Sequence, residues 1–116
     1  MISERQAVAM IEEELTANDL KHLHTKHLHD FMQVYASNTA QLGEQLELRK
    51  FESQLIVADR LYTEGSLELK EVMEDVYISG LSHCLELHPD LMSIAKGHLP
   101  LALITRMQKD QLSNNP

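Results

Sequence analysis

The stretch SLELKEVMEDVYISGLSHCLELHP, residues 66–89, decides the fold class, because it contains the longest apolar stripe in the chain. When the residues are plotted at about 100° per position, the apolar ones fall on one side of a helix. They are Leu69, Val72, Met73, Val76, Tyr77, Gly80, Cys84 and Leu87. Pro89 ends this helix, since the residue before a proline resists helical backbone angles. The pattern predicts a long amphipathic helix with one buried face.

Two further helical patterns precede it. Ser3 followed by Gln6 is a capping-box signal, which predicts a first helix that ends near Leu15. A second helix is expected to begin at Asn18, its cap, and to end near Ala36. Its apolar side comprises Leu20, Leu23, Phe31, Val34 and Tyr35. The turn-prone run Ser-Asn-Thr at 37–39 then predicts a break in the chain.

A third helix is predicted to stop at Gly65, which would adopt the left-handed conformation that often ends a helix. Its apolar positions are Leu48, Phe51, Leu55, Ala58 and Tyr62. Pro89 and Pro100 each suit the first turn of a further helix. The helix after Pro89 should end at Gly97, and the helix after Pro100 carries Leu103, Ile104 and Met107. Residues 110–116 should fray as a tail.

Length and composition agree with these helices. The chain has 116 residues, 43% of them hydrophobic, and only 4% are aromatic, which favours helix over strand. Connections between the predicted helices are short, so neighbouring helices should pack antiparallel. We therefore predict an all-α fold over residues 1–116 as a single domain. It should be a compact bundle of about four main helices plus one or two short C-terminal helices.

The charge balance indicates which classes of partner the protein can bind. A formal net charge of −8 argues against nucleic acid as a direct partner and favours a basic protein. The acidic residues concentrate in residues 64–90, which contain seven acidic side chains and one basic side chain. No apolar run is long enough to cross a membrane, the start lacks a signal-peptide pattern, and one cysteine excludes an internal disulfide. The sequence therefore predicts a cytoplasmic location.

The side of the long helix opposite its apolar stripe is a candidate partner-binding face. It presents Glu68, Glu71, Asp75, Ser82 and Glu86. Ile78 falls among these residues, and an apolar residue surrounded by charges is typical of a protein interface. The simpler interpretation is an acidic face that serves solubility alone.

A histidine cluster suggests a second kind of site. His22, His24, His27 and His29 lie within KHLHTKHLHDF, residues 21–31, and imidazole is a common metal ligand. On a helix, only His24 and His27 lie close together on the apolar side, so a metal site would need a further ligand. His83 and His98 are candidates for that ligand. The alternatives are partly buried, hydrogen-bonded histidines or a pH sensor.

Catalytic patterns are weaker. Cys84 lies on the apolar stripe, where a thiol usually fills space, and the neighbouring His83 points about 100° away from it. The four glycines are isolated, so no glycine-rich phosphate loop is present. We therefore predict that the protein is not an enzyme and requires no cofactor.

The stretch FESQLIVADRLYTEGSLELKEVMEDVYISGL, residues 51–81, followed by HLP at residues 98–100, resembles a family of short, uncharacterised helical bacterial proteins. The resemblance implies a bacterial cytosolic protein, and it brings no active residues with it. Size, charge and the lack of catalytic patterns favour an immunity or antitoxin-like inhibitor that binds a basic toxin or effector. The alternative is a small metal-binding or metal-responsive protein that uses His24 and His27. A homodimer is the third interpretation.

Overall fold

The computed structural model describes residues 1–21, 23 and 27–113. These residues form helices α1 (Glu4–Glu14), α2 (Ala17–Leu20), α3 (Leu28–Glu44), α4 (Leu48–Glu64), α5 (Leu67–Val72), α6 (Ile78–Leu87), α7 (Pro89–His98) and α8 (Leu101–Ser113). A π-helical segment, η1 (Met73–Tyr77), joins α5 to α6 without a break. Apart from one β-bridge between Ile2 and Gly65, the described chain contains no β-structure. The prediction of an all-α bundle is confirmed.

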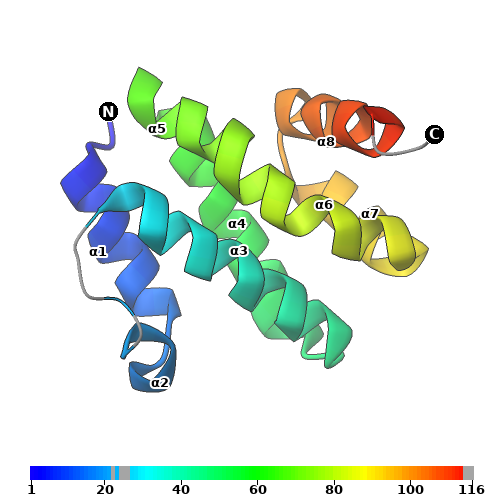
Figure 1. Ribbon diagram of the computed structural model, residues 1–116, viewed down its shortest axis with the longest axis horizontal. Coiled ribbons are helices and arrows are strands. Elements are labelled where there is room, and N and C mark those ends of the chain that lie inside the picture. The colour runs from blue at the N-terminus through cyan, green and yellow to red at the C-terminus, as the bar shows by residue number, and fades with distance from the viewer. Residues whose placement is uncertain (22, 24–26, 114–116) are drawn as a thin grey trace.

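The helices are arranged around one core. α3 and the continuous helix α5–η1–α6 lie side by side, with α4 behind them (Figure 1). α1 packs against α3 at one edge, α8 packs against α6 at the other, and α7 contacts both α4 and α6. The largest fully buried side chains come from α1, α3, α4 and the α5–η1–α6 helix: Tyr35, Tyr77, Phe51, Ile11, Met32, Leu55, Leu61, Leu69, Met73, Ile78, Leu81 and Leu85.

The first helix begins as predicted. The Ser3 hydroxyl accepts a hydrogen bond from the Gln6 N–H (3.2 Å), and the Gln6 side chain accepts one from the Ser3 N–H (2.9 Å). These two bonds satisfy donors that a helix N-terminus otherwise leaves unpaired. Before the cap, the Ile2 N–H donates to the Glu64 carbonyl at 2.7 Å. The N-terminus is thereby attached to the end of α4.

The predicted second helix is two helices, so the boundary at Asn18 is wrong. Thr16 caps α2, because its hydroxyl accepts from the Asp19 N–H (3.2 Å) and the Asp19 carboxylate accepts from the Thr16 N–H (2.9 Å). α2 ends at Leu20, and α3 begins at Leu28 after His27, whose backbone is extended. A second capping box, which sequence inspection missed, places this start two residues earlier.

The predicted end near Ala36 is also wrong, because α3 continues to Glu44. The Ser-Asn-Thr run lies inside it, and the side chains of Asn38 and Thr39 have tertiary partners. Gln54 of α4 donates to the Asn38 side-chain oxygen (2.6 Å), and its own side-chain oxygen lies 2.6 Å from the Thr39 hydroxyl. Partners on another helix remove the preference of these residues for local turns.

The third helix ends at Glu64 with Gly65 as its cap, close to the predicted stop. The reason for the glycine differs from the prediction, because Gly65 has φ −80° and ψ 162°, an extended backbone that any residue adopts. A Cβ at this position would overlap the Leu61 carbonyl oxygen and lie 2.6 Å from a Leu69 methyl group. Lack of space, rather than a left-handed turn, therefore requires glycine here.

The long fourth helix contains the largest departure from the prediction. The Ile78 N–H donates to the Met73 carbonyl, five residues back, where an α-helix would bond four residues back. The wider turn rotates the residues after it by about 100° relative to a regular helix. Ile78 and Ser82, predicted to face solvent, are therefore buried, and Leu87, predicted to be buried, is 61% exposed.

The two C-terminal helices match the prediction closely. Pro89 occupies the first turn of α7, which ends at His98, one residue beyond the predicted Gly97. Pro100 precedes α8 and its carbonyl accepts from the Leu103 N–H at 3.0 Å. The expected apolar residues Leu103, Ile104 and Met107 are buried. α8 extends to Ser113, so the predicted frayed tail is helical over residues 110–113, while 114–116 lie outside the described residues.

Candidate protein-binding surface

Four exposed residues on α5 and η1 form the candidate surface, which we call the acidic surface: Leu67, Glu68, Glu71 and Asp75. Ser66 caps this helix through a hydrogen bond from the Leu69 N–H (3.3 Å), so the acidic residues follow a fixed helix start. Burial of Leu69 and Met73 turns the opposite side of the helix towards solvent. The acidic surface is therefore held by the packing of the core beneath it.

Several charges near this surface are already compensated. Arg60 forms an ion pair with Glu64 (2.9 Å), and Arg106 of α8 forms one with Asp75 (3.2 Å). Glu68 and Glu71 belong to none of the ion pairs found within residues 1–21, 23 and 27–113. Two carboxylates of the acidic surface thus remain without an ion-pair partner in this part of the chain.

The remaining charged groups of the helix point into other contacts. The Tyr62 hydroxyl donates to the Glu74 carboxylate at 2.7 Å, and this hydrogen bond raises the pKa of Tyr62. The Lys70 ammonium lies 5.5 Å from the centre of the Tyr62 ring, a cation–π distance. Lys70 is therefore directed to the α4 side of the helix.

The predicted partner-binding residues do not form one surface. Ile78 is 0% exposed and Ser82 is buried, so neither residue can contact a partner on the folded protein, and the prediction that they are exposed is wrong. Glu86 is exposed, but it lies near the far end of α6. The π-helical turn explains why Ile78 and Ser82 are buried, since it lies between Glu71 and Ile78 and rotates the helical positions that follow it.

A different apolar residue accompanies the acidic residues. Leu67, at the first position of α5, is 68% exposed and adjoins Glu68 in sequence and Glu71 one turn later. A shallow groove of about 560 Å³ continues from Asp75 between the helices. Its walls are His29, Gln33 and Ser37 of α3 and Asp75, Val76, Ser79 and Gly80 of the neighbouring helix. The acidic surface therefore adjoins a polar recess.

The histidine cluster is divided by the structure. His22 and His24 lie outside the described residues, so the predicted pair His24 and His27 is not described as a site. His27 is exposed and precedes α3 with an extended backbone, which removes the helical geometry on which the pairing rested. Of the proposed third ligands, His83 is exposed on α6 and His98 is partly buried at the end of α7.

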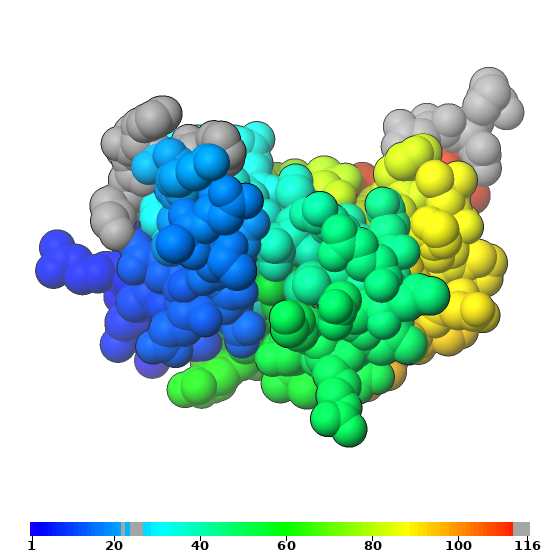
Figure 2. Space-filling view, turned by 90° about the horizontal axis from the view of Figure 1, so that it is seen from below, coloured from blue at the N-terminus to red at the C-terminus, as the bar shows by residue number. Residues whose placement is uncertain are grey.

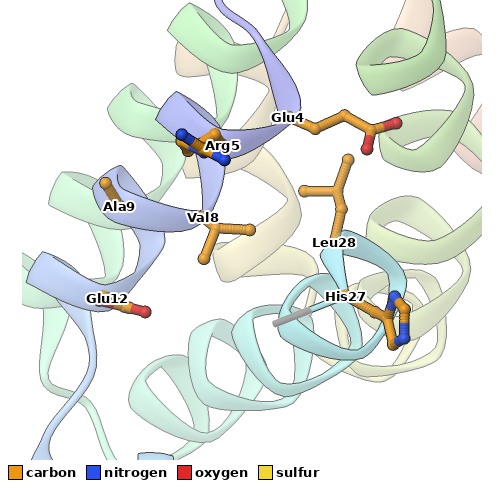
Figure 3. Close-up of a pocket in the computed structure, with 7 residues that line it drawn as sticks. All are labelled: Glu4, Arg5, Val8, Ala9, Glu12, His27 and Leu28. Carbon is orange, nitrogen blue, oxygen red and sulfur yellow. The ribbon is translucent and has the colours of Figure 1, made fainter. Parts of the chain in front are cut away.

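His27 borders a groove of about 540 Å³ between α1 and α3 (Figure 3). Val8 of α1 and Leu28 of α3 point into the space between the two helices. The other lining residues are Glu4, Arg5, Ala9 and Glu12 of α1. Its described walls thus combine an apolar floor with one imidazole and both signs of charge.

Cys84 is 5% exposed, and burial raises the pKa of its thiol to about 11, with a further contribution from Glu44. Burial that raises the pKa of a thiol lowers its reactivity as a nucleophile. The near neighbour of Cys84 is His88, one helical turn later, rather than His83. The Cys-x-x-x-His spacing could have indicated this contact from the sequence.

No protein-family model, curated protein or solved structure matches this chain. Within the described residues, no helix is both long enough and apolar enough to span a membrane.

Proposed function

We propose that the protein is a non-catalytic binding module that acts as an immunity or antitoxin-like inhibitor of a basic protein. The observation that carries the proposal is the pair Glu68 and Glu71, exposed beside Leu67 and outside the ion pairs of the described chain. A basic partner would supply the missing cations. A protein partner is favoured over nucleic acid because the net charge is −8.

The acidic surface suits rapid and salt-sensitive association. Carboxylates that lack local cations attract a basic partner over distances of about 10 Å at moderate ionic strength. Leu67 supplies the apolar contact that the sequence assigned to Ile78, since an exposed leucine loses water when a partner covers it. The recess that begins at Asp75 gives space for a partner side chain at the edge of the acidic surface.

The proposal is tested by capture from a lysate of the native organism at low and high salt, followed by identification and calorimetry with the purified partner. The test variant reverses Glu68→Lys and Glu71→Lys, which leaves the Asp75–Arg106 ion pair intact. The matched control reverses two exposed acids elsewhere, Glu13→Lys and Glu47→Lys, and has the same net charge.

We expect a basic partner whose affinity falls at least about tenfold in the test variant and about threefold or less in the control. The single substitution Leu67→Ala should also weaken binding, but it should leave the salt dependence of the affinity unchanged. Equal losses in the test and control variants would reject the acidic surface as the binding site. Recovery of the chain itself as the sole partner would replace the inhibitor proposal with a homodimer.

A further inference from the structure

Three side chains with metal-binding atoms meet where α3 ends beside α6. Glu44 is the last residue of α3, Cys84 lies in the final turns of α6, and His88 caps the end of α6. One carboxylate oxygen, the thiol sulfur and one imidazole nitrogen all lie within 4.8 Å of one another. This is the one group of three or more such residues with this proximity in the described parts of the chain.

The helix geometry accounts for the grouping. Cys84 and His88 are four residues apart, which places both on the same face at the end of α6. Glu44 comes from the other helix, and the end of α3 lies next to the segment that joins α6 to α7 (Figure 2). Leu91 of α7 packs closely on the backbone of α3 at Gly43, since a Cβ added there would lie 2.8 Å from a Leu91 methyl carbon. This contact helps to hold the end of α3 in place.

The end of α3 is also fixed by its own hydrogen bonds. The Glu47 N–H donates to the Leu42 carbonyl (2.9 Å) and the Leu46 N–H donates to the Gly43 carbonyl (3.0 Å), the two bonds of a Schellman motif. The Cys84 sulfur lies 3.7 Å from the Ala40 carbonyl oxygen of α3. Glu44 itself is exposed, so an ion can reach the group from solvent.

The three ligand types are those of zinc. A thiolate, an imidazole and a carboxylate bind Zn²⁺ at about 2.3, 2.0 and 2.1 Å, and tetrahedral ligands at these lengths lie roughly 3.3–3.7 Å apart. Separations within 4.8 Å therefore need small side-chain movements to reach this geometry. Three protein ligands leave the fourth position for water or for a group from another molecule.

We propose that Glu44, Cys84 and His88 form a site for Zn²⁺ or a similar divalent transition-metal ion. The site is distinct from the histidine pair that the sequence suggested, and it is independent of the acidic surface. Binding replaces the thiol proton of Cys84 by the metal ion, and the proton is released to solvent. The ion would join the end of α3 to the end of α6.

The experiment uses the full chain, treated with chelator and then titrated with Zn²⁺ by calorimetry and thermal unfolding. We expect one ion per chain at this site and a rise in Tm that increases with zinc concentration. Titration with Co²⁺ should give the near-ultraviolet charge-transfer absorption of a thiolate–cobalt bond, which reports Cys84 directly because the chain has one cysteine.

Variants separate this site from other histidines. Glu44→Gln, Cys84→Ser and His88→Gln should each weaken zinc binding at least about 100-fold, since each removes a direct ligand. Glu44→Gln is informative even if the buried Cys84→Ser variant unfolds, because Glu44 is exposed. His83→Gln, on the same helix, is the matched control and should bind zinc as the unaltered protein does.

A background variant with His22, His24, His27 and His29 changed to Gln removes zinc binding by the histidine cluster. Retention of the cobalt–thiolate absorption in this background supports the proposed site. Loss of zinc binding there, with full binding in the Cys84→Ser protein, would overturn the proposal in favour of the histidine cluster. Absence of the thiolate absorption at saturating Co²⁺ would also overturn it.

Discussion

Two helices that the sequence presents in the same way, α4 and α5–η1–α6, behave differently in the folded protein. In α4 the apolar residues Phe51, Leu55 and Ala58 are buried as predicted, and the outward Ile56 is 54% exposed. In α5–η1–α6 the predicted stripe is buried or half-buried as far as Tyr77, and beyond it the buried face shifts to include Ile78 and Ser82 while Leu87 becomes exposed. An apolar stripe therefore identifies the buried face only while the hydrogen bonds remain regular.

The cause of the rotation lies in the core around η1. Tyr77 is fully buried, with its ring 5.5 Å from that of Tyr35 and its hydroxyl donating to Thr39 at 3.2 Å. The Tyr35 hydroxyl donates to the Gln54 carbonyl of α4 at 2.8 Å. The wide turn allows Tyr77 and Ile78 to be buried together, which a regular helix places about 100° apart.

The same substitution in both helices gives the largest expected contrast. Ile78→Ala should lower the free energy of unfolding by about 2–5 kcal/mol, because it leaves a cavity in a closed core. Ile56→Ala on α4 should change it by at most about 1 kcal/mol, because that side chain is half exposed. Urea unfolding measures both. Similar small effects would mean that α6 keeps the regular face predicted from its sequence.

Alkaline pH should act mainly through the η1 core. Burial raises the pKa of both Tyr35 and Tyr77, so the folded protein keeps protons that the unfolded chain releases above pH 10. The two tyrosines contribute their full stabilisation of the folded protein below about pH 10. Above that pH the free energy of unfolding falls, by up to about 2.7 kcal/mol per pH unit for two tyrosines. Urea unfolding at pH 9, 10 and 11 measures this loss.

Single tyrosine variants assign the alkaline effect to its helix. Tyr77→Phe should roughly halve the contribution of the two buried tyrosines to the slope, because its fully buried hydroxyl keeps its proton in the folded protein. Tyr62→Phe on α4 should reduce the slope by less, because Tyr62 is only partly buried and its pKa is raised mainly by the hydrogen bond to Glu74. The contribution of Cys84 is common to all these proteins and cancels in the comparison. An unchanged slope in the Tyr77→Phe protein would contradict the buried position of this hydroxyl.

Two glycine-to-alanine substitutions, one at the junction of α4 and α5 and one in α7, should change the free energy of unfolding in opposite directions. Gly65→Ala should destabilise the protein by about 1–3 kcal/mol, because the added methyl group has no space beside Leu61 and Leu69. Gly97→Ala in α7 should stabilise it by about 0.5–1 kcal/mol, because nothing lies within 4 Å of the added Cβ and alanine favours helix. Thermal unfolding distinguishes the two signs.

The smallest expected effect lies before α4. Leu46 has φ 61°, a left-handed conformation that costs a residue with a side chain about 1–2 kcal/mol, and its side chain is exposed. Leu46→Gly should therefore raise the free energy of unfolding by roughly 0.5–1 kcal/mol after the added flexibility of the unfolded chain is subtracted. A decrease in stability in urea would indicate that the leucine side chain makes stabilising contacts.

Some residues of the candidate sites could be placed from the sequence, and others could not. Glu68, Glu71 and Asp75 could be placed on one exposed face from spacing alone, because they precede or only enter the wide turn. Ile78 could not, because it follows that turn. The group at Glu44 has a local signal in the spacing of Cys84 and His88, but its carboxylate comes from a different helix, and no local pattern links the two.

Local signals in the sequence are enough to predict a helical chain and where most helices begin and end, because capping residues, prolines and apolar spacing act within a few neighbouring residues. The continuation of α3 through Asn38 and Thr39 depends instead on a tertiary contact, since Gln54 supplies their partners. The rotation at η1 and the meeting of Glu44 with Cys84 and His88 likewise depend on how the helices pack. These features depend on contacts between distant segments, whose energies outweigh the local preferences of each helix.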